Sequence, residues 1–207
     1  YRRLVPLWVS AVGPNRGGKT TFLQSLGLCQ VLAQAGCYVP AEEAVLTPAD
    51  LLFTHFPSRE EASWEEGRLG EEAIRLSKMF DHITGRSMVL LNEALTSTSP
   101  AEGLVLARDV IRGLSLSGAR VVFATHFHQL GLETKELSPS SSDTDGKEAS
   151  PVDSLVAETE ERERTFKISR KPPAGTSYAE DIAKKFNLHL PALREKILAK
   201  KEHKTEA

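Results

Sequence analysis

The residues with the clearest chemical meaning lie near the start of the chain. Residues 13–20, GPNRGGKT, have the spacing G-x-x-x-x-G-K-[ST] of a loop that wraps the phosphates of a nucleoside triphosphate. Glycines in such a loop let successive backbone N–H groups point at phosphate oxygens, and the helix that follows adds the positive end of its dipole. We expect Lys19 to reach the outer phosphates and the Thr20 hydroxyl to ligate Mg²⁺.

The segments on either side of this loop are those that the loop requires. The apolar run Leu7 to Val12 predicts a buried strand before it, and residues 21–35 predict a helix after it, with Gly36 as the stop signal. The alternative is a glycine-rich turn that matches the spacing by chance. The flanking strand and helix argue against that alternative, because a phosphate loop is recognised by this context as well as by its residues.

The chain then continues to alternate strand-like and helix-like runs up to about residue 133. Residues 87–91 and 119–124 are short apolar runs that predict buried strands. Residues 100–116, with Pro at the start and Gly118 just beyond the end, predict a helix between them. This alternation predicts an α/β fold with a mostly parallel sheet flanked by helices.

The rest of the chain divides less clearly. A helix is predicted over 69–83, with Ile74, Phe80 and Ile83 on one face and Leu76 nearby. Residues 138–150 are polar and lack apolar periodicity, which predicts a mobile surface loop. The later elements predicted are a strand at 165–169, a helix at 178–186 and a helix opening at Pro191. The predicted organisation is therefore a core over 1–133, a polar mobile loop over 134–162 and a carboxyl-terminal part over 163–207 that completes the domain.

A second chemical motif follows the strand predicted at 87–91. Enzymes with such a phosphate loop need an acidic residue at this strand end to hold Mg²⁺ through its water shell. The metal-holding position here is Asn92, whose amide oxygen can accept a hydrogen bond from Mg²⁺-bound water but carries no full charge. Hydrogen bonds to a charged group are roughly twice as strong as neutral ones, so we expect weaker Mg²⁺ binding. Glu93 is the candidate that activates the attacking water, as general base or orienting acceptor. The alternative for Glu93 is a carboxylate exposed to solvent.

A third motif, Ala124-Thr125-His126, follows the strand predicted at 119–124. The carboxyl ends of parallel strands face the crevice where ligands bind in open α/β sheets. His126 could therefore sense the γ-phosphate or the attacking water. His126 and His128 also form an H-x-H pair, but no Cys or carboxylate cluster accompanies it, which disfavours a metal site.

Composition and charge are those of an ordinary globular domain. The chain has 207 residues, 40% of them hydrophobic, and a net charge of −2, which argues against nucleic-acid recognition by this chain alone. Residues 184–204 nevertheless carry seven Lys or Arg and two Glu, a pattern of a solvated helix face or of a DNA or partner contact. No run approaches the length of a membrane span. Cys29 and Cys37 are expected to be reduced and buried, as in a cytoplasmic protein.

Several segments together resemble one family. They are GPNRGGKTT (13–21), GCYVPAEEA (36–44), LLNEALTSTSPAEG (90–103), FATHFHQL (123–130) and GTSYAEDIAKKFNL (175–188). In this order they resemble the carboxyl-terminal ATPase domain of the MutS DNA mismatch-repair family. The resemblance extends from the first strand to about residue 202, apart from the loop near 134–162. It implies an ABC-like P-loop NTPase fold, a homodimer with two composite ATP sites, and double-stranded DNA bound by domains outside this chain.

The resemblance also implies roles for individual residues. Lys19 would bind the β- and γ-phosphates, Thr20 and Asn92 would serve Mg²⁺, Glu93 would be the catalytic carboxylate and His126 the switch histidine. The residues implied to bind nucleotide are Gly13, Pro14, Asn15, Arg16, Gly17, Gly18, Lys19, Thr20 and Thr21. Residues 97–99 would lie on the loop that faces the partner subunit.

The chain departs from the family pattern at three places. Asn92-Glu93 stands where the mismatch-recognising enzymes have Asp-Glu, and Ala94-Leu95-Thr96-Ser97 replaces a glycine-rich turn. Residues 67–72 match a segment that carries a Ser-Thr pair acting on the partner's γ-phosphate, but they contain no hydroxyl. Either Arg68 substitutes as that donor or transmission between subunits works differently. These departures indicate a divergent MutS-like paralogue.

Three functions follow as hypotheses. The first is an ATPase that hydrolyses MgATP in a dimer and couples turnover to DNA binding by other domains. The second is a nucleotide-gated dimerisation module with little or no hydrolysis, which Asn92 and the absent hydroxyl favour. The third is a MutS paralogue that acts on recombination intermediates or stalled ribosomes. Retention of Lys19, Thr20, Glu93 and His126 favours the first.

Overall fold

The computed structural model describes residues 7–12, 18–56, 67–140, 149–160, 163–173, 186–188, 190–195 and 197. The predicted phosphate-loop residues Gly13, Pro14, Asn15, Arg16 and Gly17 lie outside the described residues, as does most of the helix predicted at 178–186. The chain forms two compact units, Tyr1–Pro173 and Ala174–Ala207. In the second unit, residues 190–195 are helical, in agreement with the helix predicted to open at Pro191.

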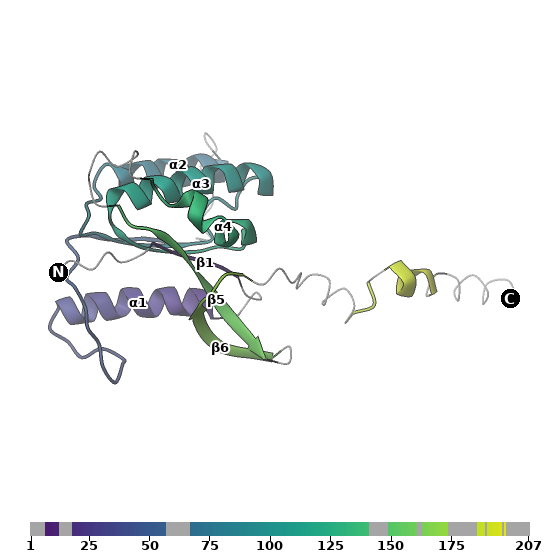
Figure 1. Ribbon diagram of the computed structural model, residues 1–207, viewed down its shortest axis with the longest axis horizontal. Helices are drawn as coiled ribbons and strands as arrows, with labels where there is room; N and C mark the ends of the chain where they lie inside the picture. Colours follow the sequence, from purple (N-terminus) through teal and green to yellow (C-terminus); the bar gives the residue numbers. More distant parts are fainter. Residues whose placement is uncertain are drawn as a thin grey trace, which may run out of the picture. The chain divides into compact units, whose positions relative to one another are not determined.

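The first unit is built on a six-stranded sheet with strand order β2-β3-β4-β1-β5-β6 (Figure 1). The strands are β1 (Leu7–Val12), β2 (Leu52–His55), β3 (Met88–Asn92), β4 (Arg120–Ala124), β5 (Val152–Glu160) and β6 (Glu163–Arg170). All neighbouring strands pair in parallel except β5 and β6, which are antiparallel. The predicted α/β fold with a mostly parallel sheet is confirmed to this level.

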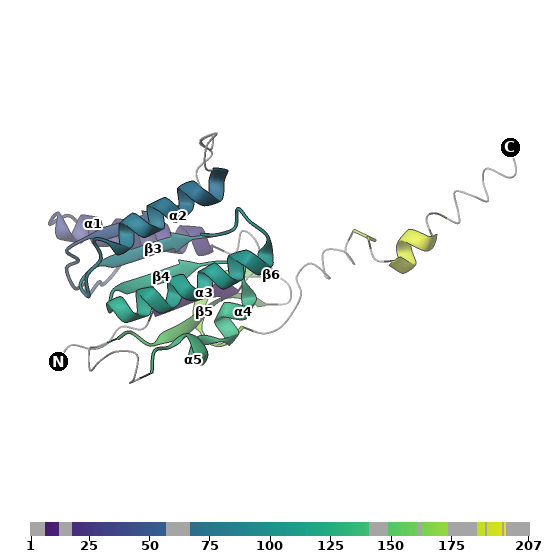
Figure 2. The ribbon, with the colours of Figure 1, turned by 90° about the horizontal axis from the view of Figure 1, so that it is seen from above.

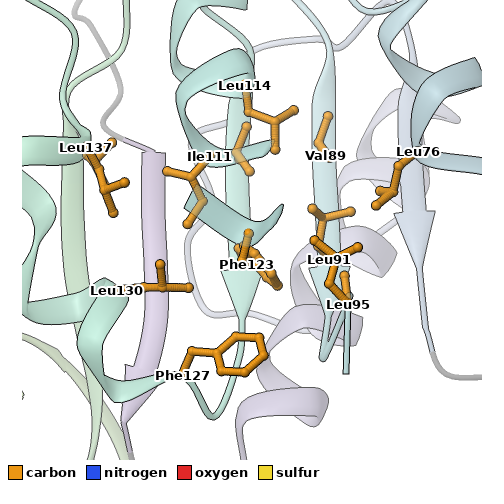
Figure 3. Close-up of a cluster of buried hydrophobic side chains, with 14 of the residues drawn as sticks. Leu76, Val89, Leu91, Leu95, Ile111, Leu114, Phe123, Phe127, Leu130 and Leu137 are labelled. Carbon is orange, nitrogen blue, oxygen red and sulfur yellow. The ribbon is translucent and has the colours of Figure 1, made fainter. Parts of the chain in front are cut away.

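Helices cover both faces of the sheet. In Figures 1 and 2, α1 (Lys19–Gln34) lies on one face, and α2 (Gly67–Phe80), α3 (Pro100–Ser117), α4 (His128–Leu132) and α5 (Thr134–Leu137) lie on the other. Successive strand residues serve opposite faces, because side chains alternate along a strand. Leu90 packs in the cluster with Leu23 of α1, while Val89 and Leu91 pack in the larger cluster under α2 and α3 (Figure 3).

The ends of α3 follow the signals in the sequence. Ser99 is the N-cap, and its hydroxyl accepts a hydrogen bond from the Glu102 backbone N–H at 3.4 Å. Pro100 occupies the first turn, where its missing N–H leaves no bond unmade. Gly118 ends the helix with φ of 70°, a left-handed conformation that glycine adopts without strain. The helix predicted at 100–116 is thereby confirmed to within one residue.

The buried face of α2 differs from the predicted one. The buried residues are Glu72, Leu76 and Met79, whereas Ile74 is 40% exposed. Phe80 and Ile83 are partly buried against the core, so part of the prediction holds. The prediction for Ile74 is wrong because the helix presents positions 72, 76 and 79 to the sheet, and position 74, two residues from both 72 and 76, lies on another side of the helix.

The polar loop predicted over 134–162 is also corrected in part. It contains α5 and the strand β5, which pairs with β1 in the middle of the sheet order. Val152, Leu155 and Val156 are buried there, and the nearby charged residues hid this apolar pattern in the sequence. Residues 141–148 lie outside the described residues. The strand predicted at 165–169 is confirmed within β6.

The two cysteines do not share one environment. Both are free, as expected, but Cys37 is exposed and Cys29 is only half-buried, so the prediction that both are buried is wrong. Cys37 follows the end of α1, where the chain has already left the core. In the part of the chain that the structure describes, no helix has the length and apolarity to cross a membrane.

Hydrogen bonds to Asp50 tie together the amino-terminal ends of the strands. Asp50 precedes β2 and accepts hydrogen bonds from Thr84 Oγ1 at 2.5 Å and Ser87 Oγ at 2.9 Å, both of which precede β3. Arg120, the first residue of β4, donates to the Thr47 carbonyl at 2.6 Å. The Thr84 hydroxyl, above all, holds the pKa of Asp50 below its usual value, and burial opposes this only in part. We call Asp50, Thr84, Ser87 and Arg120 the amino-edge network.

Candidate functional site

The opposite, carboxyl-terminal edge of the sheet brings the predicted site residues together. Ser10 of β1 pairs with Ala124 of β4, and Ala124 pairs with Asn92 of β3, so three strands end in one row. The helix α1 begins at Lys19, shortly after β1 ends. Because parallel strands direct their carboxyl ends to the same edge, motifs far apart in sequence converge here.

Thr20 and Asn92 are in direct contact. The Thr20 hydroxyl donates a hydrogen bond to the Asn92 side-chain oxygen at 3.1 Å, across 72 positions of sequence. Asn92 is 5% exposed, whereas Thr20 is exposed, so one side of the pair is fixed in the core and the other remains accessible. The two positions predicted to serve Mg²⁺ therefore lie together, although neither side chain carries a charge.

The chemistry of these donors fits Mg²⁺ only as part of a larger coordination shell. Mg²⁺ binds hard oxygen ligands, and in nucleotide sites it takes one or two from protein and the others from phosphates and water. A hydroxyl and an amide oxygen meet that requirement. Among the described residues there is no group of three or more His, Cys, Asp or Glu that could hold a metal without a nucleotide. Thr20 and Asn92 would thus hold Mg²⁺ together with phosphate oxygens.

Lys19 lies in the same site with only 7% of its surface exposed. Burial lowers the pKa of the Lys19 ammonium, and the negative charge of Glu93 opposes that shift. The influence of Glu93 places the two predicted catalytic groups within electrostatic reach of each other. Desolvating an ammonium is unfavourable, so a bound anion would be stabilised strongly at this position.

The backbone that carries Glu93 is in an uncommon conformation. Glu93 has φ of 52° and Leu95 has φ of 64°, both in the left-handed region, where a non-glycine residue is strained by about 1 to 3 kcal/mol. The Glu93 N–H donates to the Ala124 carbonyl at 2.7 Å, which anchors the start of the turn to the end of β4. We call residues 93–99 the β3–α3 loop. Its strain requires contacts that hold it in place.

Glu72 of α2 supplies polar contacts to the middle of this loop. Its Oε1 accepts a hydrogen bond from the Leu95 N–H at 2.7 Å, and its Oε2 accepts one from the Ser97 hydroxyl at 3.1 Å. His55, the last residue of β2, lies with Nε2 at 2.8 Å from the same Oε1. Burial would raise the pKa of Glu72, but His55 and the two loop donors outweigh it and hold that pKa below its usual value.

Gly103 of α3 lets the loop and the next strand end approach closely. A Cβ at Gly103 would lie 2.4 Å from the Leu95 carbonyl oxygen and 2.9 Å from Cζ of Phe127. Figure 3 shows Phe127 and Leu95 at the same end of the core as Phe123. The segment that carries Glu93 and the segment that carries His126 therefore meet over this one glycine.

The two histidines after β4 differ in their surroundings. His126 is exposed, and its ring lies 4.7 Å from that of Phe127, tilted by 45°. Burial lowers the pKa of His128, and the positive charges of Lys19 and His126 lower it further. His128 therefore lies within electrostatic reach of Lys19.

The predicted partner-facing hydroxyls are bound within their own chain. Ser97 donates to Glu72, while Thr98 and Ser99 donate to Glu102 Oε2 at 2.6 and 2.7 Å. Arg68, the candidate substitute donor, is exposed near the start of α2. Of the residues predicted to bind nucleotide, the structure describes Gly18, Lys19, Thr20 and Thr21, and Thr21 is exposed.

Sequence reasoning missed His55 and Glu72. In the sequence, Glu72 stands out only as part of the segment 67–72, which contains no partner-directed hydroxyl. A signal for its burial was present, because Glu72 shares the i, i+4, i+7 spacing of Leu76 and Met79. His55 carried no comparable signal, since a four-residue strand with half-exposed residues has little periodicity.

Known proteins similar to this chain point to one family. The sequence pattern that defines MutS domain V matches residues 9–188. The DNA mismatch repair protein Msh6 of Gallus gallus is 37% identical over 123 residues, which are 59% of this chain and 9% of that protein. Msh6 of Homo sapiens has the same identity and coverage. The DNA mismatch repair protein MutS of Geobacillus thermodenitrificans is 34% identical over 119 residues, 57% of this chain and 13% of that protein. The chain spans about a tenth of the length of these relatives.

Proposed function

The chain belongs to the MutS domain V family, and from that premise we propose that it binds MgATP and hydrolyses it. The observation that carries the proposal is the Thr20–Asn92 hydrogen bond beside Lys19 and Glu93. It joins the end of the predicted phosphate loop to the strand end that carries the candidate catalytic carboxylate. Phosphoryl transfer requires this combination, because its catalysis depends on positioning and charge stabilisation rather than on covalent chemistry by the protein.

The strand order supports the ABC-like P-loop NTPase fold that the resemblance implies. β4 lies between β1 and β3, so the segment with His126 starts between the phosphate loop and Glu93. Gly18, which directly precedes α1, has φ of 88°, a left-handed conformation that glycine adopts without strain. The amino-terminal end of a helix suits phosphate, because its N–H groups and the positive end of its dipole favour negative charge.

Each residue of the site has a proposed role. Gly18, Lys19, Thr20 and Thr21 bind phosphate oxygens, with the Lys19 ammonium on the β- and γ-phosphates. Glu93 accepts a hydrogen bond from the attacking water and aligns it. His126 senses the γ-phosphate from the end of β4. Mg²⁺, held by Thr20, Asn92 and the phosphates, would neutralise charge on the transferred group.

A second candidate function is nucleotide binding with very slow turnover. Asn92 favours it, because an amide replaces the carboxylate that usually supports Mg²⁺. In that case the site would act as a nucleotide-gated dimerisation module. Retained Glu93, within electrostatic reach of Lys19, favours hydrolysis instead.

The partners of the whole protein are part of the proposal. The relatives are named as DNA mismatch repair proteins, and this chain corresponds to about a tenth of their length. We infer that double-stranded DNA is bound by domains outside this chain and that the chain dimerises through its ATP-binding face. A closed two-fold dimer is the commonest arrangement for such subunits. A role on recombination intermediates or ribosomes instead of mismatches remains the alternative.

The test is steady-state hydrolysis of ATP with Mg²⁺ over a range of protein concentrations, with Glu93→Gln as the control. Turnover per subunit that rises with concentration and is lost in the variant is the expected result. Binding of ATP without turnover above that of Glu93→Gln would favour the second function. Absence of ATP binding would contradict both.

A further inference from the structure

The β3–α3 loop is anchored on both sides of Glu93, and the two anchors differ in kind. Before Glu93 comes strand β3, and the Glu93 N–H itself bonds the Ala124 carbonyl of β4. After Glu93, the next described polar anchor is the Leu95 N–H on the Glu72 carboxylate. The first anchor continues the sheet, whereas the second depends on one side chain from another helix.

The Glu72 carboxylate is a nearly buried hydrogen-bond acceptor for this loop. Its side chain is 9% exposed and that of His55 is 10% exposed, so the pair is almost fully desolvated. Removing an ionised carboxylate from water is unfavourable unless its hydrogen-bonding capacity is satisfied. Both Glu72 oxygens are satisfied by the loop and by His55, and no part of the proposed ATP chemistry requires Glu72 itself.

The strain of the loop explains why such an acceptor is useful. Leu95 is 2% exposed and left-handed, so its side chain is locked into the core while its backbone is held in an unfavourable conformation. Without the Glu72 carboxylate, the buried Leu95 N–H would lose its partner and the turn could relax. Relaxation two residues away would move the Glu93 carboxylate relative to Lys19.

We propose that Glu72 is a positioning residue for Glu93: supported by His55, its carboxylate fixes the β3–α3 loop at Leu95 and Ser97 and thereby aims Glu93 into the site. This rests on the proposed ATPase function. Glu72 does not touch the nucleotide in this assignment. It acts on the rate of turnover through the backbone that carries Glu93.

The experiment compares Glu72→Ala, Glu72→Gln and Asp50→Asn in the whole chain. Asp50 is the matched control, since its carboxylate also accepts hydrogen bonds on both oxygens, here from two side-chain hydroxyls, but lies in the amino-edge network. The measurements are kcat for ATP, Kd for a non-hydrolysable ATP analogue with Mg²⁺, and the hydrogen-exchange rate of the Leu95 amide.

Glu72→Ala should lower kcat by about 10- to 100-fold, the loss that follows a displacement of roughly 1 Å at a reacting group. The Kd should change less than about threefold, since the phosphate-binding residues are untouched, and the Leu95 amide should exchange faster. Glu72→Gln keeps an oxygen that can accept from Leu95, so it should recover part of kcat. Asp50→Asn should change none of the three.

Two results would overturn the proposal while leaving the ATPase function standing. One is a Leu95 amide that exchanges faster in Glu72→Ala with kcat unchanged. The other is a lower kcat together with a higher Kd in both Glu72→Ala and Asp50→Asn. That result would mean that the two substitutions destabilise the fold in general. An unaltered chain that binds the analogue but never hydrolyses ATP would contradict the ATPase function, and the positioning role would fall with it.

Discussion

The two edges of the parallel sheet are both tied by a carboxylate, but the two carboxylates are surrounded differently. At the amino-terminal edge, Asp50 bonds hydroxyls of residues that precede the next strand, and the neighbouring Arg86 is largely exposed. At the carboxyl-terminal edge, Glu72 is buried, pairs with His55 and holds a loop in which Glu93 and Leu95 are left-handed. The amino-edge network provides hydrogen bonds between the segments at the amino-terminal ends of the strands. Glu72, in contrast, holds a strained turn near the buried Lys19.

This difference indicates where the molecule gives up stability for function. Strained backbone and buried charge are unfavourable in the folded chain and gather at functional sites. In the described part of the first unit they gather at one edge, around Lys19, Glu93 and Leu95. Changes at the carboxyl-terminal edge should therefore alter function more than stability, and changes at the amino-terminal edge the reverse.

Glu93→Gln should produce the largest functional effect. General-base or orienting groups typically contribute about 10²- to 10⁴-fold to rate, so kcat should fall by that order while ATP binding persists. Single-turnover hydrolysis with radiolabelled ATP, beside equilibrium binding, measures both. Turnover retained at the unaltered rate would show that Glu93 is not the catalytic carboxylate.

Lys19→Met should separate function from stability. Loss of a charge-assisted hydrogen bond of about 1.5 to 3 kcal/mol weakens ATP binding by roughly 10- to 100-fold. Thermal stability without nucleotide should change less than ATP binding does, because methionine fills much the same space and removes a charge whose burial is unfavourable. The measurements are ATP titration and the melting temperature. A large fall in melting temperature would mean that Lys19 stabilises the fold. That result would contradict the proposed difference between the two edges of the sheet.

Gly103→Ala and Gly113→Ala test the two ends of α3. Alanine gains about 1 kcal/mol of helix propensity over glycine at either position. At Gly103 an added Cβ would lie 2.4 Å from the Leu95 carbonyl oxygen, a backbone atom that cannot rotate away as a side chain can. Overpacking of about 1 to 3 kcal/mol should therefore outweigh the gain in helix propensity and destabilise the fold. At Gly113 it meets only the Phe80 ring at 3.0 Å, which can shift.

Urea unfolding of both variants provides the measurement. Gly113→Ala should be neutral or stabilising and should leave turnover unchanged. Gly103→Ala should be destabilising and should also lower turnover, because Leu95 moves with it. Equal stability of the two variants would remove the argument that the β3–α3 loop depends on close packing against α3.

Asp50→Asn should give the smallest effect, confined to stability. The folded pKa of Asp50 is lowered chiefly by the Thr84 hydroxyl, so its hydrogen bonds stabilise the fold above the unfolded pKa and lose this effect as pH falls through the folded value. The variant should thus be slightly less stable at pH 7. Below about pH 4 the difference from the unaltered chain should shrink. Denaturation curves from pH 3 to 7 test this, and a change in kcat would contradict it.

Much of the first unit could be predicted because its signals are local. The strand at Leu7–Val12 and the helix ended by Gly118 follow from apolar runs and caps within a few residues. The convergence of Thr20 with Asn92 followed from one further rule, that parallel strands end at one edge. The strand β5 is hidden in the sequence by its charged neighbouring residues. The predicted inward face of α2 is wrong at Ile74 because Glu72, a charged residue, takes the position that faces the sheet.

The sequence by itself determined which residues could do the chemistry, since the phosphate-loop spacing and the Asn92-Glu93 strand end are properties of short segments. Only the tertiary structure decided how Glu93 is held. The Glu72 carboxylate reaches Leu95 across 23 positions, and His55 joins it from the far edge strand. Such contacts depend on the packing of α2 against the sheet and on the ends of three strands at once. No local pattern encodes that arrangement, because the energy that stabilises it arises only when the separate elements meet.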